Sequence, residues 1–547
     1  MYSTDVPQSR RITQVICAIV WCLLSGGPIF GFAALKPILV TEHVYESVCD
    51  ISVNSTESGS MFSNLVLDPS KFGGLTATLL GGAHSSSEKA VGVLASSAAK
   101  CTAQDLKLNM MFTVGAVLTN VSALVIGRLL DIRGPRFCGL IGAGFLYLAC
   151  LVFIFAKDIE ASPILSYFDP YLIGYGAMAL GGPFAYISSF QLSNSFPKKS
   201  GTILALLTGA FDASSAVFLV YKIFYSKTAG AFTVPNFFKL YLIVPIFITL
   251  VQVFMMPAES YKTAPETNLC IGEHVPEDAS ASDLLETVVS RGSANETDPL
   301  IRTAVRRDSI GDALKQPYAD EGEQFLVEHS GGIFGILHGY SAKYQLKTPW
   351  FYLMCAFATI QMLRLNYFVA TITTQYTYLF HSLESAESLT HFFDIALPLG
   401  GVISIPFVGM VLDYYSTTVV LGALLAVSLA IGFLGLSGNF IAGVINVCIF
   451  VSYRPFFYTA VSDFCAKVFG FDTFGTVYGA IICTSGVFNF SQSILDRLTH
   501  TTFDMNPIPI NFTLVMITLV IGGVILTYVH KQTILYSAKK QRQLNLA

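Results

Sequence analysis

Long apolar segments alternate with short polar turns along most of this 547-residue chain. A membrane-spanning helix needs about 20 mainly apolar residues, and twelve segments reach roughly that length. They lie at roughly 13–39, 108–130, 137–157, 169–195, 201–225, 237–256, 350–380, 389–412, 417–436, 439–461, 473–495 and 511–530. Two polar stretches, 41–106 and 258–348, interrupt the series, and the second separates two sets of six. The pattern predicts an all-α membrane protein with twelve transmembrane helices in two six-helix halves.

Basic residues in the short loops predict the orientation, because cytoplasmic loops carry an excess of Lys and Arg. Arg10 and Arg11 precede the first span, Lys198 and Lys199 lie in the turn after the fourth, and Lys531 follows the last. All fall on one side of a twelve-span chain. The expected parts are a cytosolic tail at 1–12, a helical half at 13–257, a disordered cytosolic loop at 258–348, a second half at 349–530 and a cytosolic tail at 531–547.

Composition supports a membrane protein and narrows the classes of function. Only 12% of the residues are charged, against about 25% in soluble domains, whereas 53% are hydrophobic and the mean hydropathy is +0.60. The net charge of -4 gives no indication of a nucleic-acid partner. The spans contain no metal-ligand cluster, nucleophile motif or phosphate-binding glycine loop, so we expect neither an enzyme nor a cofactor.

The 41–106 loop carries marks of an extracytosolic compartment. Cys49 and Cys101 lie near its two ends, and an oxidising compartment would allow them to form a disulfide; two free thiols are the alternative. Asn54 begins an Asn-Ser-Thr glycosylation sequon on the same side. These residues predict a glycosylated, disulfide-closed loop.

The two halves share a short motif at the same position. Residues 127–136 read GRLLDIRGPR between the second and third spans, and residues 409–418 read GMVLDYYSTT between the eighth and ninth. Both contain Gly-x-x-x-Asp, with Gly127 and Asp131 in the first copy and Gly409 and Asp413 in the second. Such a repeat is expected of carriers that bind substrate between two related halves.

The first copy resembles the loop signature of the major facilitator superfamily. Gly127, Asp131, Gly134 and Arg136 match it, Ile132 and Pro135 depart from it, and Arg133 supplies a displaced charge. The resemblance implies that the glycine lets two helices approach and that the aspartate holds the halves together on the cytosolic side. The second copy lacks the basic residues, so we expect a weaker gating role there. The alternative is a helix-end turn with arbitrary charges.

Further segments are similar to solute carrier family 43, whose members are facilitative carriers of large neutral amino acids, with one branch for purine nucleobases. They include FGFAALKPIL at 30–39, FQLSNSFP at 190–197, GAFDASSAVF at 209–218 and the run from YRPFFYTAV to GTVYG at 453–479. The resemblance covers nearly all spans, fails in the central loop and leans toward fungal members. It implies the major facilitator fold.

In that fold, spans one, four, seven and ten line a central cavity, and their polar residues become candidate substrate ligands. An arginine can grip a carboxylate with two hydrogen bonds, whereas tyrosines and apolar neighbours suit an uncharged side chain. Either arginine could instead be structural. The candidate ligands are Pro28, Tyr186, Gln191, Asn194, Arg364, Asn366, Tyr367, Tyr453, Arg454 and Tyr458.

Asp212 lies in the middle of the fifth span, where a charged residue usually faces a polar interior and has a partner. We expect a buried partner that fixes helix packing; a direct role with substrate or protons is the alternative. Resemblance to facilitative carriers favours uniport.

Two short motifs occupy the central loop. Glu296, with Leu300 and Ile301, resembles an acidic dileucine sorting signal, and Ser309 follows two arginines in a pattern that basophilic kinases accept. A solvated linker is the alternative for both. The signal favours a vacuolar or lysosomal membrane over the plasma membrane and sorting adaptors as partners.

These observations predict a monomeric membrane carrier of large neutral amino acids that works by alternating access in the lipid bilayer. Purine nucleobases and monocarboxylates are alternative substrates. A membrane sensor that has lost transport is the alternative class.

Overall fold

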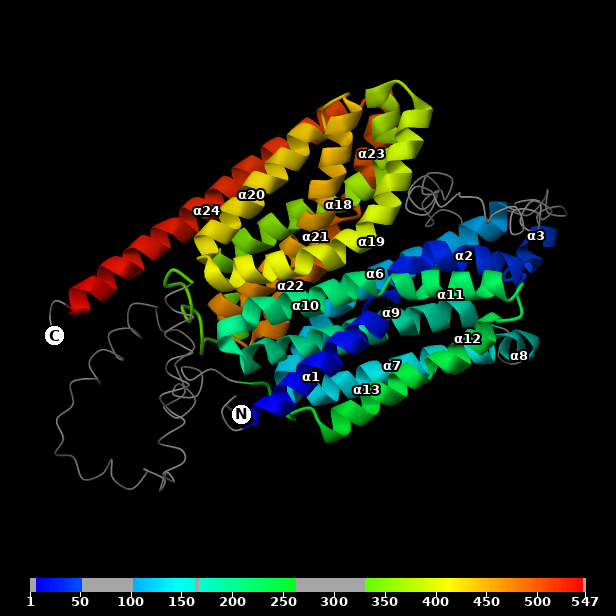
Figure 1. Cartoon of the computed structure of the whole chain (residues 1–547), viewed down its shortest axis with the longest axis horizontal. Coiled ribbons are helices and arrows are strands. Elements are labelled where there is room, and N and C mark those ends of the chain that lie inside the picture. The colour runs from blue at the N-terminus through cyan, green and yellow to red at the C-terminus, as the bar shows by residue number, and fades with distance from the viewer. Residues whose placement is uncertain (1–5, 52–101, 163–166, 262–329, 545–547) are drawn as a thin grey trace.

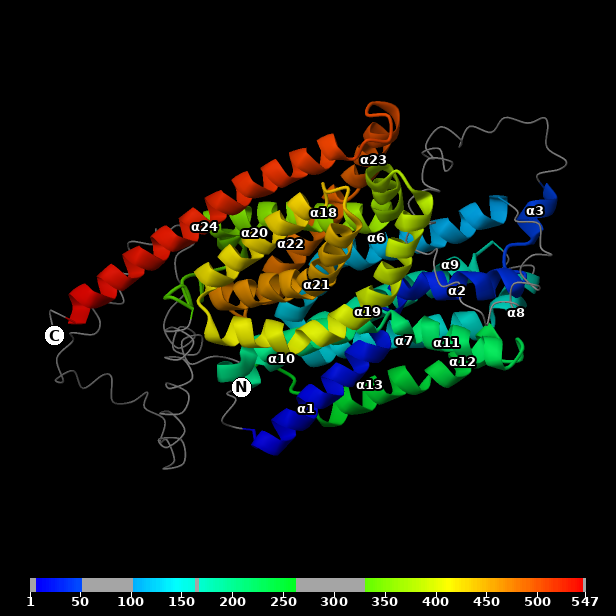
Figure 2. The same cartoon turned by 45° about the horizontal axis from the view of Figure 1, so that its top comes forward.

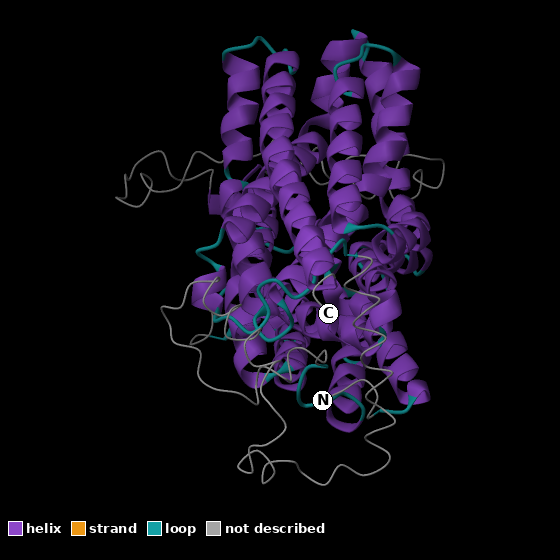
Figure 3. Cartoon of the chain, turned by 90° about the vertical axis from the view of Figure 1, so that its left-hand side faces the viewer, coloured by secondary structure: helices purple, strands orange, loops and turns teal. Residues whose placement is uncertain are grey.

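The computed structural model describes residues 6–51, 102–162, 167–261 and 330–544, and the regular elements in these ranges are all helices (Figure 3). Two bundles lie against each other (Figure 1). The N-terminal half contains α1 (Gln8–Trp21), η2 (Cys22–Gly26), η3 (Pro28–Gly31), α2 (Phe32–Thr41), α3 (Ser47–Ile51), α6 (Thr102–Arg133), α7 (Pro135–Ile154), α8 (Ala156–Ala161), α9 (Pro170–Ser189), η5 (Phe190–Ser195), η6 (Pro197–Lys199), α10 (Ser200–Ala213), α11 (Ala216–Lys227), α12 (Val234–Tyr241) and α13 (Ile243–Phe254). The C-terminal half contains α17 (Ala342–Gln345), α18 (Pro349–Phe380), α19 (Leu383–Tyr414), α20 (Thr417–Leu434), α21 (Phe440–Phe469), α22 (Phe474–Phe488), α23 (Ser491–Thr501) and α24 (Ile508–Leu544).

Each of the twelve expected spans coincides with one or more of these helices. Eight helices in the described ranges are long and apolar enough to cross a membrane, and the bent pair Leu383–Leu397 and Leu399–Tyr414 makes a ninth. The other three expected spans are the broken first one, α9 and the shorter α22. Almost every residue of α9 is buried. A helix that does not face lipid can carry the glycines and polar residues that lower its hydropathy.

Spans one and five are both interrupted in the middle. Pro28 has no backbone N–H to donate, and the chain passes from a π-helical turn through Gly27 into a 3₁₀ turn. The N–H of Gly27 donates to the Ser214 hydroxyl at 2.7 Å, at the point where α10 ends. The Ser214 hydroxyl at the break of span five therefore satisfies the backbone N–H group at the break of span one, inside the N-terminal half.

The halves meet along α6 with α22 and along α10 with α19 and α21. At the other end of the molecule the two bundles diverge, while α1 begins and α24 ends toward the end where the halves are joined (Figures 1 and 2). Glycines allow the close crossings, as is common between membrane helices. A Cβ at Gly127 would lie 1.8 Å from the carbonyl oxygen of Gly475, and one at Gly479 would lie 2.3 Å from that of Ala123.

Helices extend past several of the expected domain boundaries. α1 begins at Gln8 rather than after residue 12, and α24 continues to Leu544, well past residue 530. The ends of the expected disordered loop are structured because they find partners on the bundles. The Leu337 N–H donates to the Val468 carbonyl at 3.0 Å, and Tyr261 is fully buried.

Several predicted features lie outside the described residues. Cys49 is disulfide-bonded, whereas its expected partner is outside the described ranges. The sites outside them are Asn54, Cys101, Glu296, Leu300, Ile301 and Ser309.

Candidate substrate site and gate

Asp131 lies in the last turn of α6 and contacts the beginning of α22 in the other half. Its carboxylate accepts the backbone N–H groups of Gly475 at 2.8 Å and Thr476 at 2.7 Å, and also the Thr476 hydroxyl. The first N–H groups of a helix have no partner within it, and they favour a negative charge. Asp131 therefore joins the two halves through a helix N-terminus.

Asp413 makes the same set of contacts in the opposite direction. It lies near the end of α19 and accepts the N–H groups of Gly201 at 2.7 Å and Thr202 at 3.2 Å, together with the Thr202 hydroxyl. These two residues begin α10. We expected a weaker role for this second copy, but its carboxylate has the same kinds of partners as Asp131.

Sequence reasoning missed the residues that donate hydrogen bonds to the two aspartates. Both aspartates bind a Gly-Thr pair at a helix start, Gly201-Thr202 in the first half and Gly475-Thr476 in the second. The glycine leaves room, since a Cβ at Gly475 would lie 2.3 Å from the Gly127 carbonyl oxygen. The threonine supplies a third donor. The Gly-Thr pair is a second internal repeat and could have been found from the sequence.

The basic residues of the first motif make contacts within the N-terminal half. Arg136 donates to the carbonyl oxygen of Met256 and so holds the end of span six. Arg133 stacks over the Phe137 ring at 5.8 Å. Gly134 has a φ of +81° in the turn between α6 and α7, a conformation that favours glycine. These residues shape the α6–α7 hairpin.

Asp212 pairs with Arg454 across the interface between the halves. The distance between the Asp212 Oδ1 and Arg454 Nη2 atoms is 3.6 Å, and the two side chains keep 9% and 25% of their surface exposed. Tyr458, one turn further along α21, hydrogen-bonds to the Arg454 side chain. Asp212 thus has the buried partner that its position predicts, and that partner comes from the opposite half.

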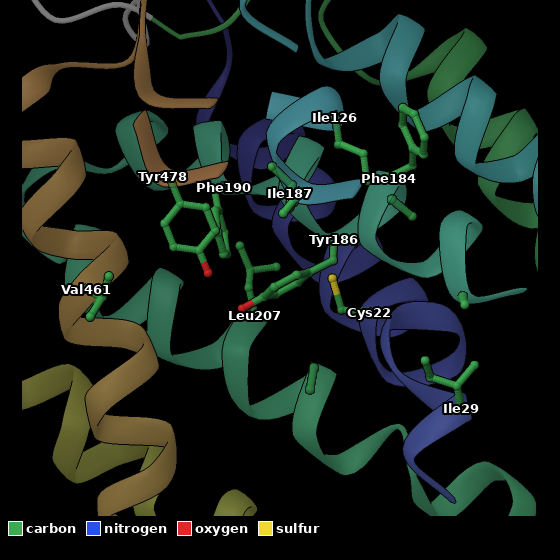
Figure 4. Packing of buried hydrophobic residues seen from close by; sticks show 14 of the residues in the cluster. Cys22, Ile29, Ile126, Phe184, Tyr186, Ile187, Phe190, Leu207, Val461 and Tyr478 are labelled. Atoms are coloured by element: carbon green, nitrogen blue, oxygen red, sulfur yellow. The ribbon is translucent and has the colours of Figure 1, made fainter. Parts of the chain in front are cut away.

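Aromatic residues fill the space between the gate and this ion pair. The Tyr186 hydroxyl donates to Thr208 at 3.1 Å, one turn before Asp212 on α10. Its ring lies 4.7 Å from that of Phe190, which in turn lies 5.3 Å from the Tyr478 ring in the other half. Figure 4 shows these rings converging from the two bundles. They are all buried, so aromatic side chains from both halves pack together at this point of the interface.

Two expected ligands on span four are used elsewhere. The Gln191 side-chain oxygen accepts the Tyr261 N–H at 3.0 Å, and the Asn194 amide donates to the Tyr261 carbonyl at 2.9 Å. The Tyr261 hydroxyl donates to Gln14 on α1 at 2.7 Å. Gln191 and Asn194 thus hold the beginning of the central loop in this structure, and their contact with substrate stays a prediction.

Arg364 also lies away from the interface. Its Nη1 donates to the Ser428 hydroxyl at 2.6 Å and to Thr518 at 3.1 Å, both within the C-terminal half. Tyr367 pairs with Thr499 at 2.8 Å and is buried. Tyr453 is also buried in this bundle. Adjacent helix positions differ by about 100°, so Arg454 faces the other half and Tyr453 does not.

The remaining candidate ligands are Pro28 and Asn366. Pro28 is buried in the break of span one, next to the Gly27–Ser214 contact. Asn366 is half-buried on α18.

Asp463 and Lys467 form a buried ion pair at 2.6 Å that sequence reasoning did not find. The Lys467 ammonium also donates to the carbonyl of Leu412, which directly precedes Asp413.

Comparison with known proteins identifies the family. The fold matches a crystal structure of XylE, a proton:xylose symporter of the major facilitator superfamily, with a TM-score of 0.55, 12% identity and 96% of each chain covered. The chain therefore has the fold of this superfamily. No family model matches it. It is 45% identical to Protein FMP42 of Saccharomyces cerevisiae over 96% of both chains.

Two further relatives confirm the resemblance to solute carrier family 43. The Equilibrative nucleobase transporter 1 of Bos taurus is 22% identical over 95% of both chains. The human Large neutral amino acids transporter small subunit 3 is 31% identical over 126 residues, which is 23% of this chain and 22% of that protein. This major facilitator protein is therefore a multi-pass membrane transporter and not an enzyme.

Proposed function

We propose that this transporter carries large neutral amino acids, and that the Asp212–Arg454 pair binds the two charged ends of the substrate. An α-amino acid carries a carboxylate and an ammonium a short distance apart. Arg454 offers a guanidinium for the carboxylate, and Asp212 offers a carboxylate for the ammonium. The pair therefore presents both complementary charges at one point between the halves, and this observation carries the proposal.

Apolar surroundings support a neutral side chain on the substrate. Phe211 precedes Asp212, and its ring lies 6.1 Å from that of Phe30 and 4.4 Å from that of Tyr186. An ordered apolar wall with a few polar groups is typical of small-molecule sites. Substrate would replace each partner of the ion pair with its own opposite charge, which would free the two halves to rock about the site.

We favour uniport because Asp212 is already neutralised by Arg454, which leaves no free carboxylate at the pair to carry a proton. We also propose that the protein lies in the vacuolar membrane; the plasma membrane is the alternative. We further propose that it is a monomer, that sorting adaptors bind Leu300 and Ile301, and that Asn54 is glycosylated. A fluorescent fusion with Leu300→Ala and Ile301→Ala tests the location, since relocation to the plasma membrane is expected.

Uptake by purified protein in liposomes tests the substrate. Saturable leucine or phenylalanine uptake without a proton gradient is expected, and Arg454→Gln should lower it at least tenfold, because hydrogen bonds to a charged group contribute about 1.5–3 kcal/mol each. 4-Methylpentanoate, which lacks the ammonium, should compete weakly with leucine in the wild type. Asp212→Asn should weaken leucine binding without weakening this competitor.

Uptake of adenine and of lactate by the same liposomes tests the two alternative classes of substrate. The relative named as a nucleobase transporter matches 95% of the chain, so adenine is the specific second candidate. Saturable adenine uptake with no leucine uptake would replace amino acids by nucleobases as the substrate. Lactate uptake that is unaffected by Asp212→Asn would point to a monocarboxylate carrier instead.

A further inference from the structure

A small cavity inside the C-terminal half is separate from the interface between the halves. It measures about 40 Å³ and lies among α18, α20, α21 and α24. This volume holds a small ion or a few water molecules and is too small for an amino acid or a nucleobase. Its polar lining comes from Gln361, Arg364, Tyr367, Ser428, Tyr453 and Asn511.

The charge in this cavity is positive. Arg364 donates to Ser428 and Thr518, which are both uncharged. In the described part of the chain, no carboxylate lies within ion-pair distance of Arg364. Gly432 leaves the space for the guanidinium, since a Cβ there would lie 2.8 Å from its Nη2 atom. Arg364 is partly buried, and a cation that lacks a counter-charge is costly even there in a membrane protein.

Two further donors belong to residues that line the cavity. The Gln361 side-chain nitrogen and the Tyr453 hydroxyl are buried and make no well-aligned hydrogen bond, and the hydroxyl has the Ser428 side chain beside it. Their residues are 1% and 2% exposed. The Gln361 oxygen accepts from the Ser428 hydroxyl at 2.8 Å, which fixes the amide so that its N–H₂ group is the free one. Unsatisfied buried groups of this kind call for a bound partner.

We propose that this cavity is a binding site for a small inorganic anion such as chloride. The anion would neutralise Arg364 and accept hydrogen bonds from Tyr453 and Gln361. It would thereby tie α18 to α21, the helix that carries Arg454, and stabilise the C-terminal half. The site is independent of the substrate proposed above.

Thermal unfolding of the full-length protein in detergent tests the site without any transport assay. Chloride and bromide should raise the Tm by a few degrees in a saturable way, whereas gluconate at equal ionic strength, which is too large for the cavity, should not. Tyr453→Phe removes one donor and should raise the chloride concentration needed about tenfold or more. Tyr376→Phe, a buried tyrosine of the same half outside the cavity lining, should leave the response unchanged.

Gln361→Glu provides a second, opposite test. The new carboxylate would serve as a permanent counter-charge for Arg364, so this variant should be as stable in gluconate as the wild type is in chloride, and it should lose its response to chloride. An identical Tm of the wild type in chloride and gluconate would overturn the proposal, and so would a chloride response that Gln361→Glu retains.

Discussion

Gly127 has no room for a side chain, because any Cβ would collide with the Gly475 carbonyl oxygen. Gly127→Ala should therefore force α6 and α22 apart and destabilise the state that is closed on the cytosolic side. Leucine uptake should fall at least tenfold, and a cysteine placed at the start of α22 should become more reactive to a cytosolic thiol reagent.

Gly144 provides the matched control for this change. It lies on α7 with open space around its Cα, so Gly144→Ala should leave uptake within about twofold. Equal loss of uptake in both variants would show that helix propensity, rather than the crossing, limits transport.

His338 lies in the structured end of the central loop, outside the membrane spans. Burial lowers its pKa from 6.5 to about 4. The unfolded chain therefore binds a proton at a higher pH than the folded one does, and stability falls as the pH drops from 7 to 5. The difference in pKa between the folded and unfolded chain predicts that the free energy of unfolding falls by roughly 2 kcal/mol from pH 7 to pH 5.

Thermal unfolding between pH 7 and pH 5 checks this expectation. His338→Gln cannot titrate and should lose less stability over the range than the wild type. A wild-type protein whose stability is flat over this range would contradict the burial of a neutral imidazole.

At the scale of the helices, the broken spans one and five stabilise each other through Ser214. Ser214→Ala would leave the buried Gly27 N–H without its acceptor, which costs about 1–3 kcal/mol. The Tm should fall by several degrees. Ser215→Ala is the control, because the Ser215 hydroxyl donates to the Asp212 carbonyl within the same span and not to span one. Equal effects of the two substitutions would mean that the contact between the breaks is unimportant.

At the scale of the whole molecule, the two halves hold each other through two equivalent carboxylates. Asp131→Asn and Asp413→Asn each remove a charge from a helix N-terminus in the opposite half. We expect reductions in uptake that agree within about threefold, and a larger loss in the double variant, because either contact alone keeps the cytosolic side partly closed. Asp158→Asn, on exposed α8, should have no effect.

A strong effect of Asp131→Asn beside a negligible effect of Asp413→Asn would contradict this equivalence. It would restore the weaker role that the missing basic residues of the second motif predict.

The sequence by itself predicted the all-helical membrane fold, the place of each helix along the chain and the two aspartates that the structure finds between the halves. Apolar length is set by the thickness of the bilayer, and the Gly-x-x-x-Asp repeat marks the same helix end in each half. The charge of Asp212 within an apolar span was also enough to predict a buried partner.

Only the tertiary structure decided which polar residues face each other. Arg364 and Arg454 lie in similar sequence contexts, yet one is enclosed in its own bundle and the other meets Asp212 in the opposite half. The two arginines differ in the direction in which they point around the axis of their helix. Position along the sequence does not determine this direction when apolar and polar neighbours are mixed on all sides. The packing of whole bundles sets that direction.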